Sequence, residues 1–271
     1  MYYLDHIVQF VDQPEAAMQY LQEHGLHTVH GGQHTQWGTY NALSYVGSAY
    51  IELIGIYDEE QFSVAAKAPY SLHETYEKNH RQNGFNRIAL RTTTIEEDAK
   101  TFYQAGYDVL GPERFSRTRP DGSIISWQLL HIGKQGTLFD YPFFIQWDLP
   151  EQERMQELTE LGILGNHEAG DVEIAEVIHL VQNLEPLYEL QKLLQLPSST
   201  VINEESNVEI FTMHTASGNL SYYKPIGEGD GWNAFLDFGN GLHTVVISGA
   251  QKEKYITFDH ANYVFKKRST S

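Results

Sequence analysis

The chain has no cysteine and no long apolar run, and both absences narrow what it can be. Without thiols it forms no disulfide, no thiolate metal site and no cysteine nucleophile. No stretch approaches the roughly 18 apolar residues that a membrane span needs. The opening MYYLDHIVQF also lacks the basic, apolar and small-residue regions of a signal peptide. We therefore expect a cytoplasmic protein.

Positive charge is also scarce, with 18 Lys and Arg against 36 Asp and Glu and a formal net charge of −18. An acidic average repels nucleic acid and anionic membranes, so we expect neither as a partner. Glycine-rich phosphate loops, GxSxG elbows and HExxH pairs are missing too. Nucleotide-dependent transfer, serine hydrolysis and metalloprotease chemistry therefore lack their usual signals.

Three segments of the chain open alike, each as a short strand followed by an amphipathic helix. The segments are LDHIVQFVDQPEAAMQYLQEHGL, FNRIALRTTTIEEDAKTFYQAGY and AEVIHLVQNLEPLYELQKLLQL. Each predicted helix begins near an acidic residue, which complements the helix dipole. Superposing the helix starts places His6, Arg87 and Glu176 at one equivalent position in the repeat.

The runs after the first two helices alternate as strands do, and Pro-Asp-Gly marks a turn between two of them. The predicted fold is α+β, with tandem βαβββ modules whose curved mixed sheet forms a cup. We predict a domain over 1–148 (module one 1–60, module two 84–148), a helical linker over 149–171, and a third, degenerate module with extra C-terminal strands over 172–271. An odd module count exposes a sheet edge, which the C-terminal strands or a homodimer partner would cover.

The repeat resembles the vicinal oxygen chelate superfamily, to which glyoxalase I and extradiol dioxygenases belong. More narrowly, the ordered segments resemble the glyoxalase-like domain family across roughly residues 3–148. The segments are LDHIVQFVD, GGQHTQWGTYN, YIELIGI, FSRTRPDGSIISWQL and FFIQWD. Members differ widely in chemistry, so the resemblance implies a fold and a small-molecule cup rather than a reaction.

In enzymes of this superfamily, first-strand and fourth-strand side chains of two modules hold a divalent metal. Carried over by resemblance, the positions in module one are His6 and Glu52. The positions in module two hold Arg87 and Gln146 instead, so two expected ligands are missing. His34, between His6 and Glu52 in the sequence, is the candidate for a third ligand of Zn, Ni, Mn or Fe.

A metal-free cup is the competing interpretation. His6 and Glu52 would then bond each other or a ligand, and serve as the catalytic pair if the protein is an enzyme. Arg87 favours this interpretation, because a guanidinium repels a divalent cation but grips a carboxylate or phosphate. Gln146 would add a polar contact in the same cup.

Four further residues are candidate ligand contacts. Arg119 follows Arg117 at the predicted hairpin, where the two arginines and Trp127 would offer a basic edge beside an aromatic surface. Trp37 and Asn41 follow His34 and would line the cup. His167, in the predicted linker, would act as a general base if the linker folds over the cup. Each has a structural alternative: a solvated hairpin, core packing or a loop histidine. No role follows from the sequence for His131, His179 or His214.

Two classes of function remain open. One is an enzyme acting on a small anionic or oxygen-rich metabolite; the other is a protein that binds such a ligand without turnover. A third reading, in which the protein acts through an interaction surface, has no particular support in the acidic composition. Glyoxalase I activity itself is not expected, because it relies on a full metal site.

Overall fold

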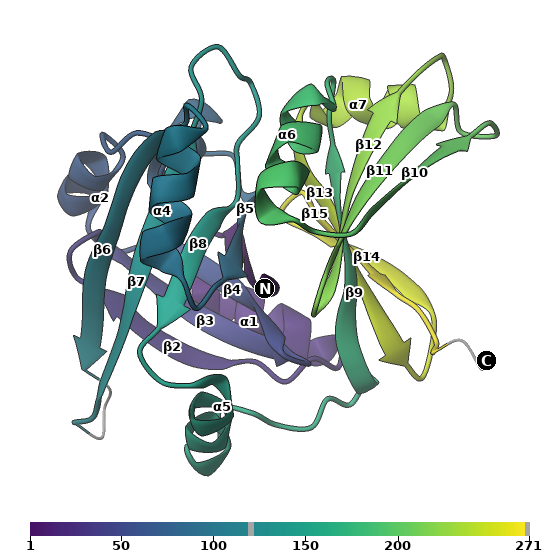
Figure 1. The fold of residues 1–271 in the computed structure, drawn as a ribbon. Helices are drawn as coiled ribbons and strands as arrows, with labels where there is room; N and C mark the ends of the chain where they lie inside the picture. Colours follow the sequence, from purple (N-terminus) through teal and green to yellow (C-terminus); the bar gives the residue numbers. More distant parts are fainter. Residues whose placement is uncertain (119–121, 269–271) are drawn as a thin grey trace.

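A computed structural model describes residues 1–118 and 122–268, and these fold into two mixed β-sheets that lie side by side (Figure 1). Over this part of the chain there are 15 strands and 7 helices. None of these helices is long and apolar enough to cross a membrane.

The first sheet has the strand order β2-β3-β4-β1-β5-β8-β7-β6. Its strands are β1 (Tyr3–Phe10), β2 (Val29–His34), β3 (Thr39–Val46), β4 (Ala49–Ile56), β5 (Gly84–Arg91), β6 (Asp108–Thr118), β7 (Ile124–Gly133) and β8 (Phe143–Trp147). Its helices are α1 (Pro14–Glu23), α2 (Glu59–Ala65), α3 (Leu72–Lys78) and α4 (Ile95–Gln104). Each half of the sheet is a strand, a helix and three strands, which confirms the predicted α+β repeat.

The first helix of each module begins where the sequence predicts. Pro14 starts α1 and the acidic Glu96 lies in the first turn of α4. Gly25 and Gly106 follow the two helices with positive φ angles of 85° and 82°, a backbone conformation that favours glycine. The buried stripe of α4 is Ile95, Ala99 and Phe102, which is the spacing of one helix face.

The two halves of the first sheet meet where β1 pairs antiparallel with β5. His6 is opposite Ala89, and Arg87 is opposite Val8. The pairing is symmetric, so Arg87 occupies the position in module two that His6 occupies in module one, as the superposed repeats predict.

The second sheet has the order β10-β11-β12-β9-β13-β15-β14. Its strands are β9 (Gly170–Leu180), β10 (Ser198–Asn203), β11 (Val208–Thr215), β12 (Gly218–Pro225), β13 (Gly241–Ala250), β14 (Lys254–Phe258) and β15 (Ala261–Phe265). The remaining helices are α5 (Glu151–Glu160), between the sheets in sequence, and α6 (Glu185–Leu194) and α7 (Asp230–Phe238).

The C-terminal strands partner the third module within the same chain. Antiparallel pairing of β13 with β9 repeats the pairing of β5 with β1, and β15 then runs parallel to β13 as β8 does to β5. No described helix or further strand stands between β13 and β14. The strands β13, β14 and β15 therefore form a reduced module that lacks a described helix. They pair beside β9 and cover the sheet edge that an odd number of modules exposes.

One apolar core runs through both sheets. It joins Leu4 and Ile7 of β1 to Val177 of β9 and to Leu187 and Leu190 of α6, all fully buried. Burial of this kind is the main favourable term in folding. The helix-covered face of the first sheet packs into this core. The opposite face of that sheet is therefore left to form a binding site.

The continuous core predicts one cooperative unfolding transition. Leu190→Ala, in the second half of the chain, should lower the unfolding free energy by about 2–5 kcal/mol, because it opens a cavity in the core. In a Trp232→Phe background, which removes the tryptophan of α7, the fluorescence of Trp37, Trp127 and Trp147 reports the first sheet alone. It should show this loss at the same denaturant midpoint as circular dichroism.

The matched control is Leu236→Ala, since Leu236 is 63% exposed on α7 and its removal should change stability little. A tryptophan transition that stays at the wild-type midpoint in Leu190→Ala would show instead that the two sheets unfold independently.

Candidate functional site

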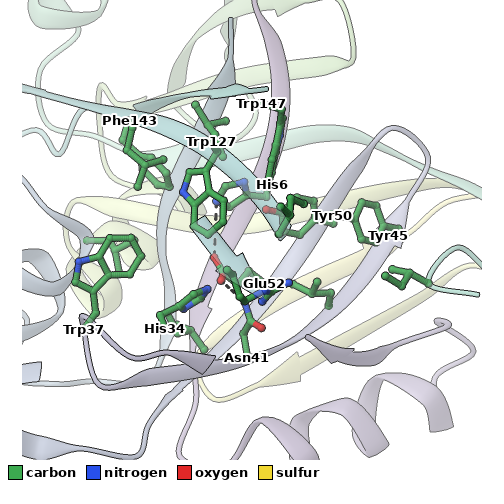
Figure 2. Close-up of a pocket in the computed structure, with 18 of the residues that line it drawn as sticks. His6, His34, Trp37, Asn41, Tyr45, Tyr50, Glu52, Trp127, Phe143 and Trp147 are labelled. Atoms are coloured by element: carbon green, nitrogen blue, oxygen red, sulfur yellow. Dashed lines mark hydrogen bonds and ion pairs between the residues drawn. The ribbon is translucent and has the colours of Figure 1, made fainter. Parts of the chain in front are cut away.

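A cavity opens on the face of the first sheet opposite α1 and α4 (Figure 2). It contains about 780 Å³ of empty space, part of it open to solvent. Its walls are largely aromatic, and the aromatic rings come from Trp37, Tyr45, Tyr50, Trp127, Phe143 and Trp147. Walls of this kind, with a few polar groups among them, are typical of small-molecule sites.

A β-bulge places two consecutive side chains on this face. The pairing of β1 with β5 skips Asp5, so that Asp5 and His6 together are opposite one residue of the partner strand. Both side chains are buried, and His6 Nδ1 lies 2.8 Å from Asp5 Oδ1. In a regular strand the two side chains would point to opposite faces.

Asp5 fixes the proton on His6. Burial raises the pKa of Asp5, but the hydrogen bond from His6 and the charges of Arg154, His6 and Arg91 outweigh it and lower the pKa to about 2. The carboxylate is therefore ionised at neutral pH and only accepts hydrogen bonds, so His6 Nδ1 carries the hydrogen. In the neutral ring Nε2 then presents a lone pair on the side of Glu52, 3.7 Å from Glu52 Oε2.

Glu52 lies between His6 and Asn41 (Figure 2). The Gly32 N–H donates to Asn41 Oδ1 at 2.9 Å, which turns the Asn41 amide nitrogen toward Glu52, where it donates to Oε1 at 2.5 Å. The neighbouring Gly31 makes room for this amide, because a Cβ there would lie 1.9 Å from Asn41 Oδ1. Gly31 is thus explained by the close approach of Asn41 on β3, and Gly32 by that of Arg117 on β6.

His34, His73 and Arg117 complete the polar lining. Burial, with smaller contributions from nearby charges, lowers the pKa of His34 to about 4 and that of His73 to about 3, so both rings are neutral at pH 7. Trp37 packs between the two rings, with centroids 5.5 Å from His34 and 5.4 Å from His73. Arg117, on β6, brings a guanidinium to the cavity beside Gly32.

The helix α5 closes one end of the cavity. Its Leu158 and the following Ile163 are lining residues. Arg154 of α5 lies over the Trp147 ring, 5.0 Å from the centroid, and forms an ion pair with Glu151. The segment between the two sheets therefore folds over the cup, an arrangement that the sequence analysis raised for the predicted linker.

Five of the residues proposed from the sequence lie together in this cavity: His6, His34, Trp37, Asn41 and Glu52. Arg119 lies outside the described residues. Arg87, Gln146 and His167 are not part of the cavity lining, and each has a different role in the fold.

Gln146 faces away from the cup. Its Oε1 accepts from the Ile95 N–H at the start of α4, on the helix-covered side of the sheet. Ala89 is opposite Phe143 in the same way that Val8 is opposite Glu52, so Phe143 stands at the fourth-strand position of module two. The assignment of Gln146 to this position from the sequence was therefore wrong in register. The register shift from Gln146 to Phe143 is odd, and an odd shift moves a side chain to the other face of the sheet.

His167 is held by the backbone. Its Nδ1 accepts from the His27 N–H at 2.9 Å, and its Nε2 lies 2.7 Å from the Tyr45 carbonyl, to which it donates. Both ring nitrogens are occupied, and burial lowers the pKa of the ring. His167 fastens the segment after α5 to the first sheet and has no free nitrogen for a general base.

The described residues do not fit the metal site of the superfamily. His6 and Glu52 supply two donors, but Arg87 and Phe143 occupy the other two positions. In the part of the chain that the structure describes, no group of three or more His, Asp or Glu side chains is arranged to hold a metal ion. His34 therefore does not complete a set with His6 and Glu52, and its Nδ1 lies 3.2 Å from Thr39 Oγ1 instead.

Sequence reasoning missed Asp5 and His73 and underrated Arg117. Arg117 had a signal, since the sequence groups it with Arg119 in the predicted basic edge. Asp5 had none, because alternation assigns it to the face opposite His6 and the bulge leaves no trace in the residue pattern.

Comparison with known proteins agrees with this architecture. The sequence profile of a family described as a glyoxalase-like domain matches residues 4–194. A search of curated proteins found no match. A crystal structure of a hypothetical protein from Staphylococcus aureus is similar over 99% of this chain and 100% of its own, with a TM-score of 0.81 and 22% identity.

A mutant of 4-hydroxymandelate synthase from Streptomyces coelicolor is more distantly similar. The likeness covers 92% of this chain and 71% of the synthase, with a TM-score of 0.55 and 12% identity. At these identities the solved structures show a shared fold and carry no activity across.

The buried Asp5 predicts a pH dependence. Its pKa is lower in the folded chain than the ordinary 3.8, so it stabilises the fold above about pH 4, and this contribution disappears as the pH falls toward 2. Asp5→Asn should lower the unfolding free energy at pH 7 by about 2 kcal/mol, and the difference from wild type should shrink between pH 4 and pH 2.

Denaturant unfolding across this pH range measures both effects. Asp237→Asn, on the exposed face of α7, removes the same charge and should show neither. A difference between Asp5→Asn and wild type that stays constant down to pH 2 would contradict the lowered pKa.

The incomplete donor set predicts weak metal binding. Protein purified without a histidine tag and incubated with Zn, Ni, Mn or Fe should retain far less than one metal per chain after desalting, because two donors fall short of the usual three. Elemental analysis measures this. Stoichiometric metal that is lost in a His6→Ala, Glu52→Ala variant would restore the metal-site interpretation.

Proposed function

The chain belongs to the glyoxalase-like domain family of the vicinal oxygen chelate superfamily, and we propose that its cup binds a small metabolite with an apolar body and an anionic or oxygen-rich head. We propose further that His6 exchanges a proton with this ligand without a metal.

The observation that carries the proposal is the line from Asp5 to His6 to Glu52 at the wall of an aromatic cavity. A base oriented by a buried carboxylate is the usual arrangement of a general acid–base histidine. Asp5 holds the ring and its tautomer, and Nε2 faces the side on which a ligand would lie. Glu52, held by Asn41, offers a second proton acceptor beside it.

Arg117 supports the anionic head. It is the arginine among the described cavity-lining residues, and a guanidinium binds carboxylate or phosphate through two parallel hydrogen bonds. The neutral His34 and His73 add donors that carry no competing charge. The ring-lined walls favour a flat or aliphatic body, since such surfaces gain from leaving water.

The proposed step is proton exchange next to a carbonyl. The C–H bond of the ligand breaks, its proton passes to His6 Nε2, and the bonding electrons move onto the carbonyl oxygen to form an enolate. The proton then returns to carbon or exchanges with solvent. Arg117 would hold the carboxylate meanwhile.

The second candidate function is ligand binding without turnover. It is favoured by the loss of the metal set in a cup that remains enclosed by α5. The two functions share one cavity and differ in whether His6 exchanges a proton.

Phenylpyruvate tests both, because it combines an aromatic ring, a carboxylate and an acidic C–H beside a carbonyl. Binding of this probe should quench the tryptophan fluorescence of the protein. The protein should also speed deuterium incorporation in D₂O at the probe's carbon next to the carbonyl, followed by NMR. His6→Gln should reduce the catalysed rate on the order of 100-fold while leaving binding within a few fold. Arg117→Met should weaken binding roughly tenfold.

His30→Gln is the control, since His30 is exposed on β2 in the same sheet. Binding without exchange would support the binding protein over the enzyme. Absence of both binding and exchange, with phenylpyruvate and with a smaller probe such as pyruvate, would contradict the proposed cup.

A further inference from the structure

A second cavity lies between the two sheets, and none of its described lining residues is shared with the cup. It contains about 1180 Å³ of empty space, part of it open to solvent. Its walls come from the segment that joins α3 to β5, the start of β5, residues 138–140, the end of β9 and the start of β13. These segments belong to different modules, so the cavity exists only because the sheets pack together.

Arg87 is buried in the wall of this cleft, only 2% exposed. Its NH1 donates to Thr75 Oγ1 at 3.0 Å, and its NH2 donates to the Tyr141 carbonyl. Its Nε has no hydrogen-bond partner among the described residues. Two neutral acceptors hold the side chain in place but do not neutralise its charge.

The counterion of Arg87 is weak. The carboxylate paired with it, Asp140, is half exposed and lies 3.8 Å from NH1, beyond hydrogen-bond distance. A buried charge is costly unless it is paired and hydrogen-bonded. A second carboxylate, Glu74, also acts on Arg87, but it is paired with Lys78. The cleft therefore contains a buried cation that has no carboxylate within hydrogen-bond distance among the described residues.

His179 is the second buried donor. It is 5% exposed, it lines the same cleft from β9, and its Nδ1 has no partner among the described residues. Its ring stacks on Tyr222 with centroids 5.0 Å apart. Burial and the charge of Arg87 lower its pKa to about 3, so the ring is neutral and can donate one N–H at pH 7.

The described lining of the cleft has more cationic than anionic side chains. Its cations are Arg87 and Lys78, of which Lys78 is paired with Glu74, and its carboxylate is Asp140. This local balance is opposite to the formal net charge of −18 over the whole chain. A cationic cleft in an acidic protein attracts anions to one place on its surface.

We infer that the cleft between the sheets is a second site, which binds a small anion through a carboxylate or phosphate group held by Arg87 and His179. The site is independent of the proposed function of the cup. Because its two buried donors come from different sheets, a bound anion would also link the sheets.

Two probes distinguish the chemical sources of the anion: inorganic phosphate and citrate, each titrated by calorimetry into the full chain in Tris chloride. At least one should bind with saturation in the millimolar range or tighter, and the one that binds more tightly identifies the group. His179→Gln and Arg87→Gln should each weaken binding at least tenfold, as expected for hydrogen bonds to a charged group.

Arg114→Ala is the matched control, because Arg114 is an exposed arginine on β6, paired with Asp148 and away from the cleft. It should change the affinity less than twofold. An equal loss in Arg114→Ala and in the cleft variants would show nonspecific attraction and would overturn the site.

Arg87→Gln removes bonds to α3 and to Tyr141, so its loss of binding counts only where circular dichroism shows a native fold. The wild-type chain then decides the matter through the ring ¹⁵N resonances of His179, assigned by their loss in His179→Gln. Saturable movement of these resonances with phosphate or citrate supports the site. Resonances that remain still while both probes reach tens of millimolar overturn it.

Discussion

The antiparallel pairing of β1 with β5 is the constraint on which the rest of the structure depends. It sets two modules back to back in one sheet, directs α1 and α4 to the same face, and leaves the opposite face to line a cup. The pairing of β9 with β13 repeats the arrangement in the second sheet. A single core, to which α6 and β9 contribute, then holds the two sheets together.

The bulge in this pairing matters as much as the pairing itself. In a regular ladder the side chains of Asp5 and His6 would point to opposite faces of the sheet, and the Asp5 carboxylate would point toward the core. The bulge brings Asp5 beside His6 behind the wall of the cup, where Trp147 Nε1 also donates to Asp5 Oδ2 at 3.0 Å. A local irregularity thus orients the His6 ring that lines the cavity.

The architecture was predictable because it rests on periodicity. Each of its signals is local in the sequence. These signals are the apolar stripe of α4, the proline at the start of α1 and the glycine after each of these helices. His6, His34, Trp37, Asn41 and Glu52 were also found, since they belong to one continuous module. Within a module, short loops leave little freedom for the strands to be misplaced.

The failures come from register and side-chain direction, which are not local. Gln146 and Phe143 are both plausible fourth-strand residues, and only the ladder with β5 decides between them. Arg87 was placed at the correct position, but its direction depends on Thr75 and Tyr141, which lie far from it in the chain. His179 was assigned no role because it is one of 13 histidines and nothing near it in the sequence marks it out.

Equivalent positions in the repeat therefore have different side-chain partners. His6 has β4 as its neighbour and turns toward Glu52, whereas Arg87 is drawn to α3 and the segment before β8. Arg87 supplies no metal donor to the cup and is instead a buried cation at the boundary between the sheets. A duplicated fold provides such pairs of positions, and each can be altered without disturbing the strand pairing that generated it.

Asp5 connects His6, the proposed proton acceptor, with α5, the helix that closes one end of the cup. Arg91 lies 3.3 Å from Asp5 and 2.9 Å from Glu151 of α5, and Glu151 in turn pairs with Arg154 over Trp147. The carboxylate that orients His6 is thus also the inner end of the chain of charges that holds α5. Buried ion pairs lose several kcal/mol when one partner is removed, because the other charge is left uncompensated. Closure of the cup and orientation of the base are consequently one property of this site rather than two.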